Sequence, residues 1–118
     1  MSDAFGMNAA QQALVREILL TAQDCIEQVM VFGSRAQGKH RQNSDLDLVL
    51  YGNADEAVCD RLWTLFQDSS LPFSVDVKSY AAIKHPPLRA HIDAAARSWL
   101  VRTEQGLEET AAKAGRTS

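Results

Sequence analysis

The chain has 118 residues, 46% of them hydrophobic, which suits one compact domain because two would each be too small to bury a stable core. Its net charge of −3 argues against the broad basic face on which sequence-independent binding to duplex DNA or RNA depends. No run approaches the roughly 18 to 20 apolar residues that cross a bilayer, and no basic-then-apolar leader opens the chain, so we expect a cytoplasmic protein with no membrane contact.

The first predicted elements are a helix and a strand. Over residues 8–22 the apolar side chains recur at steps of three and four, which is typical of an amphipathic helix. Residues 28–32 form a short apolar run rich in strand formers, so a buried strand is predicted there, ending at Gly33. Ser34 is then a candidate N-cap of a short helix that ends at Gly38.

A second strand, a second helix and a third strand are predicted next. Residues 45–51 form the strand, and Asn53 with Glu56 resembles a capping box that opens the helix. Residues 68–70 close that helix. Residues 73–78 alternate apolar and polar side chains with period two, as a strand with one covered face should.

The end of the chain is predicted to hold a last helix and a tail. The helix begins at Pro86, a residue favoured in the first helical turn. Its apolar side is made of four residues at helical spacing: Leu88, Ile92, Ala96 and Trp99. From Thr103 the chain is polar without an apolar period, so residues 1–102 are predicted to form the folded domain and residues 103–118 a flexible tail.

Two acids of the second strand are the first candidates for chemistry. Alternate side chains of a strand point to opposite faces, so Asp45 and Asp47 share one face while the leucines between and after them share the other. Two carboxylates held that close repel one another unless a cation neutralises them. A hard divalent cation such as Mg²⁺, which prefers oxygen ligands, is the usual solution.

The third strand offers a third acid, Asp76, on its polar side. If this strand lies beside the strand of Asp45 and Asp47, three carboxylates converge. That set is enough to bridge two metal ions roughly 3.5–4 Å apart in an in-line phosphoryl transfer.

A phosphate cradle is predicted at Gly33 and Ser34, where a strand turns into a possible helix start. Glycine permits close approach of the backbone, serine offers a hydroxyl, and free N–H groups at a helix start favour anions. Arg35, Lys39 and Arg41 are near enough in sequence to add positive charge.

These residues together resemble the minimal nucleotidyltransferases of the DNA polymerase beta-like superfamily. The resemblance rests on residues 33–38, Gly-Ser-Arg-Ala-Gln-Gly, followed after five residues by Ser-Asp-Leu-Asp-Leu at residues 44–48, with Asp76 in a Val-Asp-Val context. It covers nearly the whole domain. One departure is Gln37, which stands where the family often has Arg or Lys.

The resemblance implies an α/β (α+β) fold in which helices pack on one face of a small mixed sheet. It implies Mg²⁺-dependent transfer of a nucleoside monophosphate, from an NTP such as ATP, by a site with two metal ions. Its metal ligands and catalytic residues would be Asp45, Asp47 and Asp76. Its nucleotide-binding residues would be Gly33, Ser34, Arg35 and Ser44. Small members are often paired with a helical HEPN-domain protein, some as antitoxins that attach AMP to that partner, so a partner of this kind is expected.

Plainer interpretations exist for each motif. The acids could be solvated strand residues, Gly33 and Ser34 could form only a turn and a cap, and Lys78 is interpreted as a surface residue. The histidines His40, His85 and His91, and the cysteines Cys25 and Cys59, show no metal-ligand spacing and are interpreted as structural or solvent-exposed.

Three functions are compatible with the motifs. The first is the nucleotidyltransferase; the second is a non-catalytic nucleotide-binding module that masks a partner protein by forming a complex. The third is a transferase for a small molecule such as an aminoglycoside, but no further domain is present to enclose the drug. A homo-oligomer or hetero-oligomer also fits a small domain with exposed apolar helix faces.

Overall fold

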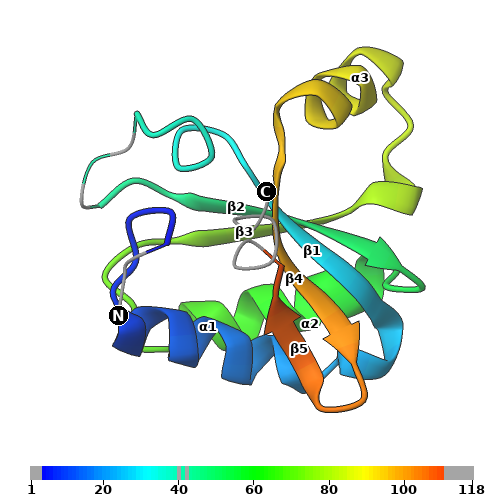
Figure 1. The fold of residues 1–118 in the computed structure, drawn as a ribbon. Coiled ribbons are helices and arrows are strands. Elements are labelled where there is room, and N and C mark those ends of the chain that lie inside the picture. Colours follow the sequence, from blue (N-terminus) through cyan, green and yellow to red (C-terminus); the bar gives the residue numbers. More distant parts are fainter. Residues whose placement is uncertain (1–3, 40, 42, 111–118) are drawn as a thin grey trace.

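The computed structural model describes residues 4–39, 41 and 43–110, and its centre is a five-stranded mixed sheet with the strand order β3-β2-β1-β4-β5 (Figure 1). The strands are β1 (Ile26–Phe32), β2 (Leu46–Gly52), β3 (Val75–Ser79), β4 (Arg97–Thr103) and β5 (Gly106–Glu109). The α-helices are α1 (Ala9–Leu20), α2 (Glu56–Gln67) and α3 (Pro86–Ala95), with short 3-10 segments at Gln23–Cys25 and Tyr80–Ala82. Only the β2–β3 pair is parallel.

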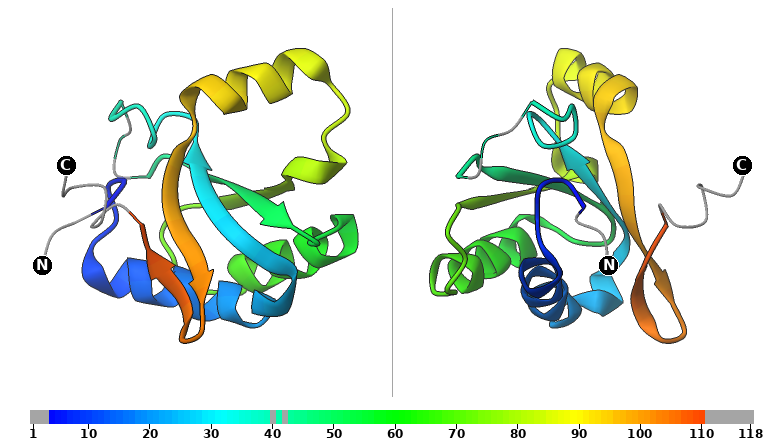
Figure 2. Two further views of the ribbon diagram at one scale, coloured as in Figure 1. Left: turned by 45° about the vertical axis from the view of Figure 1, so that its right-hand side comes forward. Right: turned by 60° about the vertical axis from the view of Figure 1, so that its left-hand side comes forward.

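The core lies mainly between the sheet and the helices α1 and α2. Leu46, Leu48 and Leu50 of β2 are buried against these helices, as their alternation predicts. On the opposite face Val49 packs with Ile92 of α3 in a smaller cluster. The expected mixed sheet with packed helices is confirmed, and the structure adds that α3 lies across the sheet from α1 and α2 (Figures 1 and 2).

The first two helices have side-chain caps at their N-termini. Asn8 and Gln11 form a reciprocal capping box at α1, with bonds of 2.8 and 3.0 Å. At α2 the cap is Asp55, whose carboxylate accepts the N–H of Val58 at 2.9 Å. The predicted cap at Asn53 is wrong because its N–H donates to the carbonyl of Cys25, so the chain is still turning there.

The last helix is shorter than predicted. It ends at Ala95, and Ala96 has an extended backbone (φ −71°, ψ 149°). Trp99 is fully buried in the main core and belongs to β4, at a bulge between the pairs Val29–Leu100 and Met30–Ser98. Its helical spacing from Ala96 was therefore coincidental, because the apolar run around it pairs as a strand.

The predicted flexible tail is wrong for residues 103–110. Strand β5 pairs antiparallel with β4, and Leu107 is only 2% exposed. The side chain of Arg16 donates to the carbonyl of Leu107 at 2.8 Å, which ties β5 to α1. A single apolar residue in a polar segment gives no period, so only tertiary contacts reveal this strand. Residues 111–118 lie outside the described residues, and no described helix is long and apolar enough to cross a membrane.

Candidate active site

Two of the predicted acids are neighbours across the sheet. Asp47 on β2 and Asp76 on β3 are paired in register, so their side chains leave the sheet on the same face. This confirms the expectation that the two strands lie side by side. Asp45 precedes β2 by one residue and is exposed, two residues from Asp47 along the chain. The three acids thus come from adjoining positions at one end of two parallel strands.

The carboxylate of Asp47 is the electrostatic centre of this group. Burial raises its pKa first, repulsion from Asp76 and from Asp45 raises it further, and the ammonium of Lys78 opposes the shift. The half-buried Asp47 is therefore a charge that the protein only partly compensates. A divalent cation would remove the repulsion, and oxygen ligands of this kind suit Mg²⁺.

Lys78 takes a larger part in the site than its interpretation as a surface residue allowed. Its ammonium forms an ion pair with Asp76, and the two side chains are 39% and 46% exposed. Residues two apart on a strand share a face, so the Asp-x-Lys spacing was the signal in the sequence. Because Lys78 also acts on Asp47, it supplies positive charge to the carboxylate group as a whole.

The carboxylates are not gathered as a metal centre in this arrangement. Within the described part of the chain, no three His, Cys, Asp or Glu side chains converge closely enough to hold a metal ion. Asp76 is paired with Lys78, and Asp45 faces solvent. The three acids offer only oxygen donors, the type that fits Mg²⁺.

Gly33 joins the turn after β1 to the acidic group. Phe32 is paired in register with Asp47, so the next residue lies beside that carboxylate. The backbone of Gly33 has φ +78°, and a Cβ atom built on it would lie 2.5 Å from Oδ2 of Asp47. Both the left-handed conformation and the close approach therefore require glycine here.

Residues 34–38 form consecutive tight turns instead of the predicted short helix. The N–H groups of Ala36 and Gln37 donate to the carbonyl of Gly33, and that of Lys39 returns to Ser34 at 3.0 Å. The half-buried Ser34 hydroxyl has no hydrogen-bond partner among the described residues, so it is available to a ligand. Ser34 thus follows directly in the chain on Gly33, the residue that approaches Asp47.

Ser44 mainly shapes the connection that leads into β2. Its hydroxyl accepts the N–H of Arg41 at 2.7 Å, and its own N–H donates to the carbonyl of Arg41 at 3.1 Å. These two bonds close a turn just before Asp45. The predicted contact of Ser44 with a nucleotide stays a prediction.

Arg35 is a structural residue, which corrects its predicted place in the phosphate cradle. It is only 2% exposed, and its guanidinium lies 4.4 Å above the ring of Phe73. It donates to the carbonyls of Ser44 at 3.0 Å and Phe5 at 2.8 Å. Burial lowers its pKa, and Asp45 offsets part of this shift. From the sequence, Arg35, Lys39 and Arg41 were equally good candidates for a basic side chain near the phosphates. The fold distinguishes Arg35, which is buried, from the other two.

Arg35→Met is expected to destabilise the protein by about 2–4 kcal/mol, because two carbonyls lose a charged donor and the stacking on Phe73 is lost. Urea unfolding followed by circular dichroism measures this change. The exposed Arg41 of the same loop provides the control, and Arg41→Met should stay within about 0.5 kcal/mol of the wild type. Equal losses for the two variants would contradict the structural role of Arg35.

The described histidines and cysteines, at positions 25, 59, 85 and 91, do not join the acidic group. His91 packs edge-on against Phe32, with ring centres 5.1 Å apart, and His85 precedes α3. Cys59 is buried, and its pKa is raised to about 11, first by burial and then by nearby acids such as Asp60 and Asp55. These placements agree with the structural interpretation. His40 lies outside the described residues.

Comparison with known proteins now identifies the class. A family model described as polymerase beta, nucleotidyltransferase matches residues 15–104, from α1 to the end of β4. The chain belongs to this family of nucleotidyltransferases. The matched range contains the whole β1–β2–β3 unit with Gly33, Asp47 and Asp76.

Within the family, the similarity is to the minimal nucleotidyltransferases, as the motifs indicated. A curated relative, the probable protein adenylyltransferase MntA of Haemophilus influenzae, is 42% identical over 55 residues, which are 45% of this chain and 48% of that protein. The chain is thus matched to about half the length of this relative. The crystal structure of a toxin–antitoxin with AMP-PNP has the same fold, with a TM-score of 0.59 and 22% identity over 75% of this chain and 71% of that one.

Proposed function

We propose that this chain transfers the AMP group of Mg²⁺-bound ATP to a hydroxyl group of a partner protein. The observation that carries the proposal is the register pairing of Asp47 with Asp76 directly beside the Gly33 turn. This geometry brings two carboxylates, whose oxygens are of the kind that Mg²⁺ prefers, beside a glycine turn. The family assignment and the adenylyltransferase name of the MntA relative support transfer of AMP.

Each part of the site has a distinct task in this reaction. Asp45, Asp47 and Asp76 would hold the Mg²⁺ ions, which neutralise charge on the triphosphate and activate the attacking hydroxyl. The Ser34 hydroxyl would donate to a phosphate oxygen, and Gly33, which has no side chain, leaves room for the Asp47 carboxylate. The acceptor oxygen forms a bond to the α-phosphorus, the bond to the β-phosphate oxygen breaks, pyrophosphate leaves, and the hydroxyl proton passes to solvent.

For the partner, we infer a helical protein of the HEPN type, and for the pair a toxin–antitoxin role in the cytoplasm, where ATP and Mg²⁺ are abundant. The sequence resemblance supports this partner. The neighbouring fold seen in a toxin–antitoxin structure agrees with it at the level of architecture.

The test is a transfer assay with the protein encoded next to this one as acceptor. Label from ATP carrying ³²P at the α-phosphate should appear on the acceptor, and label at the γ-phosphate should not, because pyrophosphate leaves. The double variant Asp45→Asn/Asp47→Asn, which keeps shape but loses charge, should transfer none. Label from the γ-position would indicate phosphoryl transfer and contradict the proposal.

The second candidate is a binding module that masks its partner without transfer. The ion pair of Lys78 with Asp76 favours it, because it neutralises one acid without a metal. A stable complex of the two proteins, with no label from any of the four NTPs, would be the result expected of this module.

A further inference from the structure

Strand β3 is an edge strand, and its outer side carries peptide groups without a partner strand. It is the first strand in the order β3-β2-β1-β4-β5. The N–H of Leu46 donates to the carbonyl of Ser74 at 2.9 Å, and Asp47 is paired with Asp76. In a parallel ladder, alternate residues turn their peptide groups to the same neighbour. Asp76 and Lys78 therefore bond toward β2, while Val77 turns its N–H and carbonyl to the free edge, as Ser79 does its N–H; the carbonyl of Ser79 begins the 3-10 segment Tyr80–Ala82.

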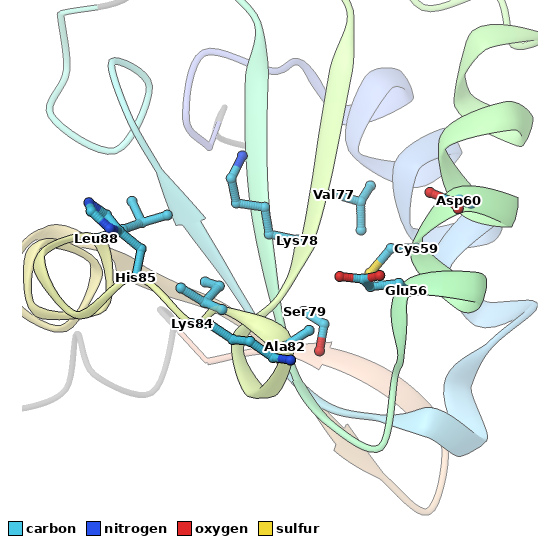
Figure 3. A pocket seen from close by; sticks show the side chains of 11 residues that line it. Glu56, Cys59, Asp60, Val77, Lys78, Ser79, Ala82, Lys84, His85 and Leu88 are labelled. Carbon is cyan, nitrogen blue, oxygen red and sulfur yellow. The ribbon is translucent and has the colours of Figure 1, made fainter.

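Two recesses adjoin β3, one near each end of the strand, with Asp76 between them along the chain. The larger, of about 380 Å³, lies beside residues 77–79 and is bounded by the start of α2 and by the connection from β3 to α3 (Figure 3). The smaller, of about 260 Å³, lies beside residues 73–75 and includes Asp45 in its lining. A chain lying along β3 from one recess to the other would pass Asp76. The shape of the edge therefore matches an extended segment better than a compact molecule.

The larger recess has walls of opposite charge. On the α2 side are the carboxylates of Glu56 and Asp60, and on the side toward α3 are Lys84 and His85 (Figure 3). The ammonium of Lys78 leaves β3 away from α2, on the face that holds Asp76. An added strand would thus have some of its side chains near Glu56 and Asp60 on the α2 face, and the others near Asp76 and Lys78 on the opposite face.

We propose that the free edge of β3 is the acceptor-docking edge, where an extended segment of the acceptor protein adds to the sheet as a further strand. Its peptide groups pair with the N–H and carbonyl of Val77 and with the N–H of Ser79. The side chains of the added strand alternate between the two faces of the sheet. If its hydroxyl residue lies on the face of Asp76, the residues before and after it lie on the face of α2. Basic side chains at those two positions would meet Glu56 and Asp60. This proposal rests on the proposed function, because it names the acceptor of the same reaction.

The geometry gives the acceptor hydroxyl a defined approach. Neighbouring strands lie roughly 4.8 Å apart, so a side chain level with Asp76 on the added strand stands one strand spacing from that carboxylate. Asp47, Asp76 and the acceptor residue then lie in one row across the sheet. The acceptor segment predicted by this row is basic residue, hydroxyl residue, basic residue.

Binding of fluorescent nine-residue peptides, measured by anisotropy, tests the docking edge without requiring transfer. A peptide with Lys-Tyr-Lys at its centre should bind about fivefold or more tightly than one with Glu-Tyr-Glu. The double variant Glu56→Lys/Asp60→Lys should reverse this order of affinities. The control Glu17→Lys/Asp24→Lys should keep it, because it makes the same change of charge at exposed sites of α1 and of the segment after α1. Thermal unfolding checks that all three proteins are folded.

Backbone N-methylation of the Lys-Tyr-Lys peptide, one residue at a time, tests the strand pairing itself. Only alternate N–H groups of an added strand face β3, so methylation should weaken binding at every second residue. Uniform sensitivity along the peptide, or a charge preference that Glu56→Lys/Asp60→Lys does not reverse, would overturn the docking edge.

The transfer assay, combined with the peptide binding, distinguishes failure of the docking edge from failure of the proposed function. Label on an acceptor whose peptides show no alternation would leave the transferase standing and refute the docking edge. Alternating, charge-dependent binding with no transfer to any acceptor would support the edge and refute the transferase.

Discussion

Asp47→Asn is expected to lower AMP transfer by roughly 10³-fold or more, about 4 kcal/mol of transition-state stabilisation, because in the proposed site a carboxylate that would hold Mg²⁺ is replaced by a neutral amide. The initial rate of label transfer from ATP measures this loss. The exposed Asp24 lies outside the site, and Asp24→Asn should transfer at the wild-type rate. A loss of less than tenfold for Asp47→Asn would contradict its role as a metal ligand.

The same variant should not be less stable than the wild type in the absence of metal. The pKa of Asp47 is raised by burial and by Asp76, so the folded state holds this proton more tightly than the unfolded state does. The metal-free protein therefore loses stability as the pH rises from the ordinary aspartate range through the raised pKa. Asn does not ionise and escapes that loss. With EDTA at pH 7, the Tm of Asp47→Asn is expected at or above that of the wild type.

Added Mg²⁺ and ATP should reverse this order. Ligands that bind only the folded state raise its stability, and the wild type should gain more than the variant because its proposed site offers the ions one more carboxylate. Equal gains of Tm in the two proteins would mean that the ions bind elsewhere.

Gly33→Ala is expected to lower transfer by about 100-fold or more, because the new methyl group would stand 2.5 Å from Oδ2 of Asp47 and displace it. Gly38 in the same loop provides a matched control. Its φ is +73°, close to the +78° of Gly33, but a Cβ atom built there meets nothing within 4 Å. Both alanine variants should lose about 1–2 kcal/mol of stability from the left-handed backbone.

Only Gly33→Ala should lose activity beyond what this destabilisation explains. Urea unfolding and transfer rates, measured on the same two variants, separate the two effects. Similar transfer by Gly33→Ala and Gly38→Ala would show that the contact with Asp47 has no part in catalysis.

Local patterns were enough to predict the strands that carry the site. Period two in residues 45–51 and 73–78 located the strands β2 and β3 and the faces of their acids, because side-chain alternation is a property of the strand itself. The pairing of Asp47 with Asp76 was a conditional expectation that the topology confirms. The local pattern does not indicate which strands are neighbours in the sheet, so the resemblance to the family was what favoured this pairing.

The wrong predictions for Arg35 and for residues 106–109 have one physical cause: tertiary contacts determine the structure at both places. Arg35 has the same loop neighbours as Lys39 and Arg41, but only Arg35 finds Phe73 and the carbonyls of Ser44 and Phe5. Residues 106–109 were predicted to belong to a polar tail. They form a strand because they pair with the edge of β4 and because Leu107 packs against α1. Distant partners of this kind leave no period in the sequence.

The order in which the site's parts come together during folding follows from the one parallel pair in the sheet. Gly33 directly follows β1 and Asp47 lies on β2, and these two strands are antiparallel neighbours joined by the single connection of residues 33–45. Asp76 joins them only after the chain has crossed over through α2 and laid β3 beside β2. Non-local pairing of this kind is slow compared with local pairing. A nascent chain that has emerged only as far as α2 therefore has Gly33, Asp45 and Asp47 but lacks Asp76, and the acidic group is complete only once the crossover has docked.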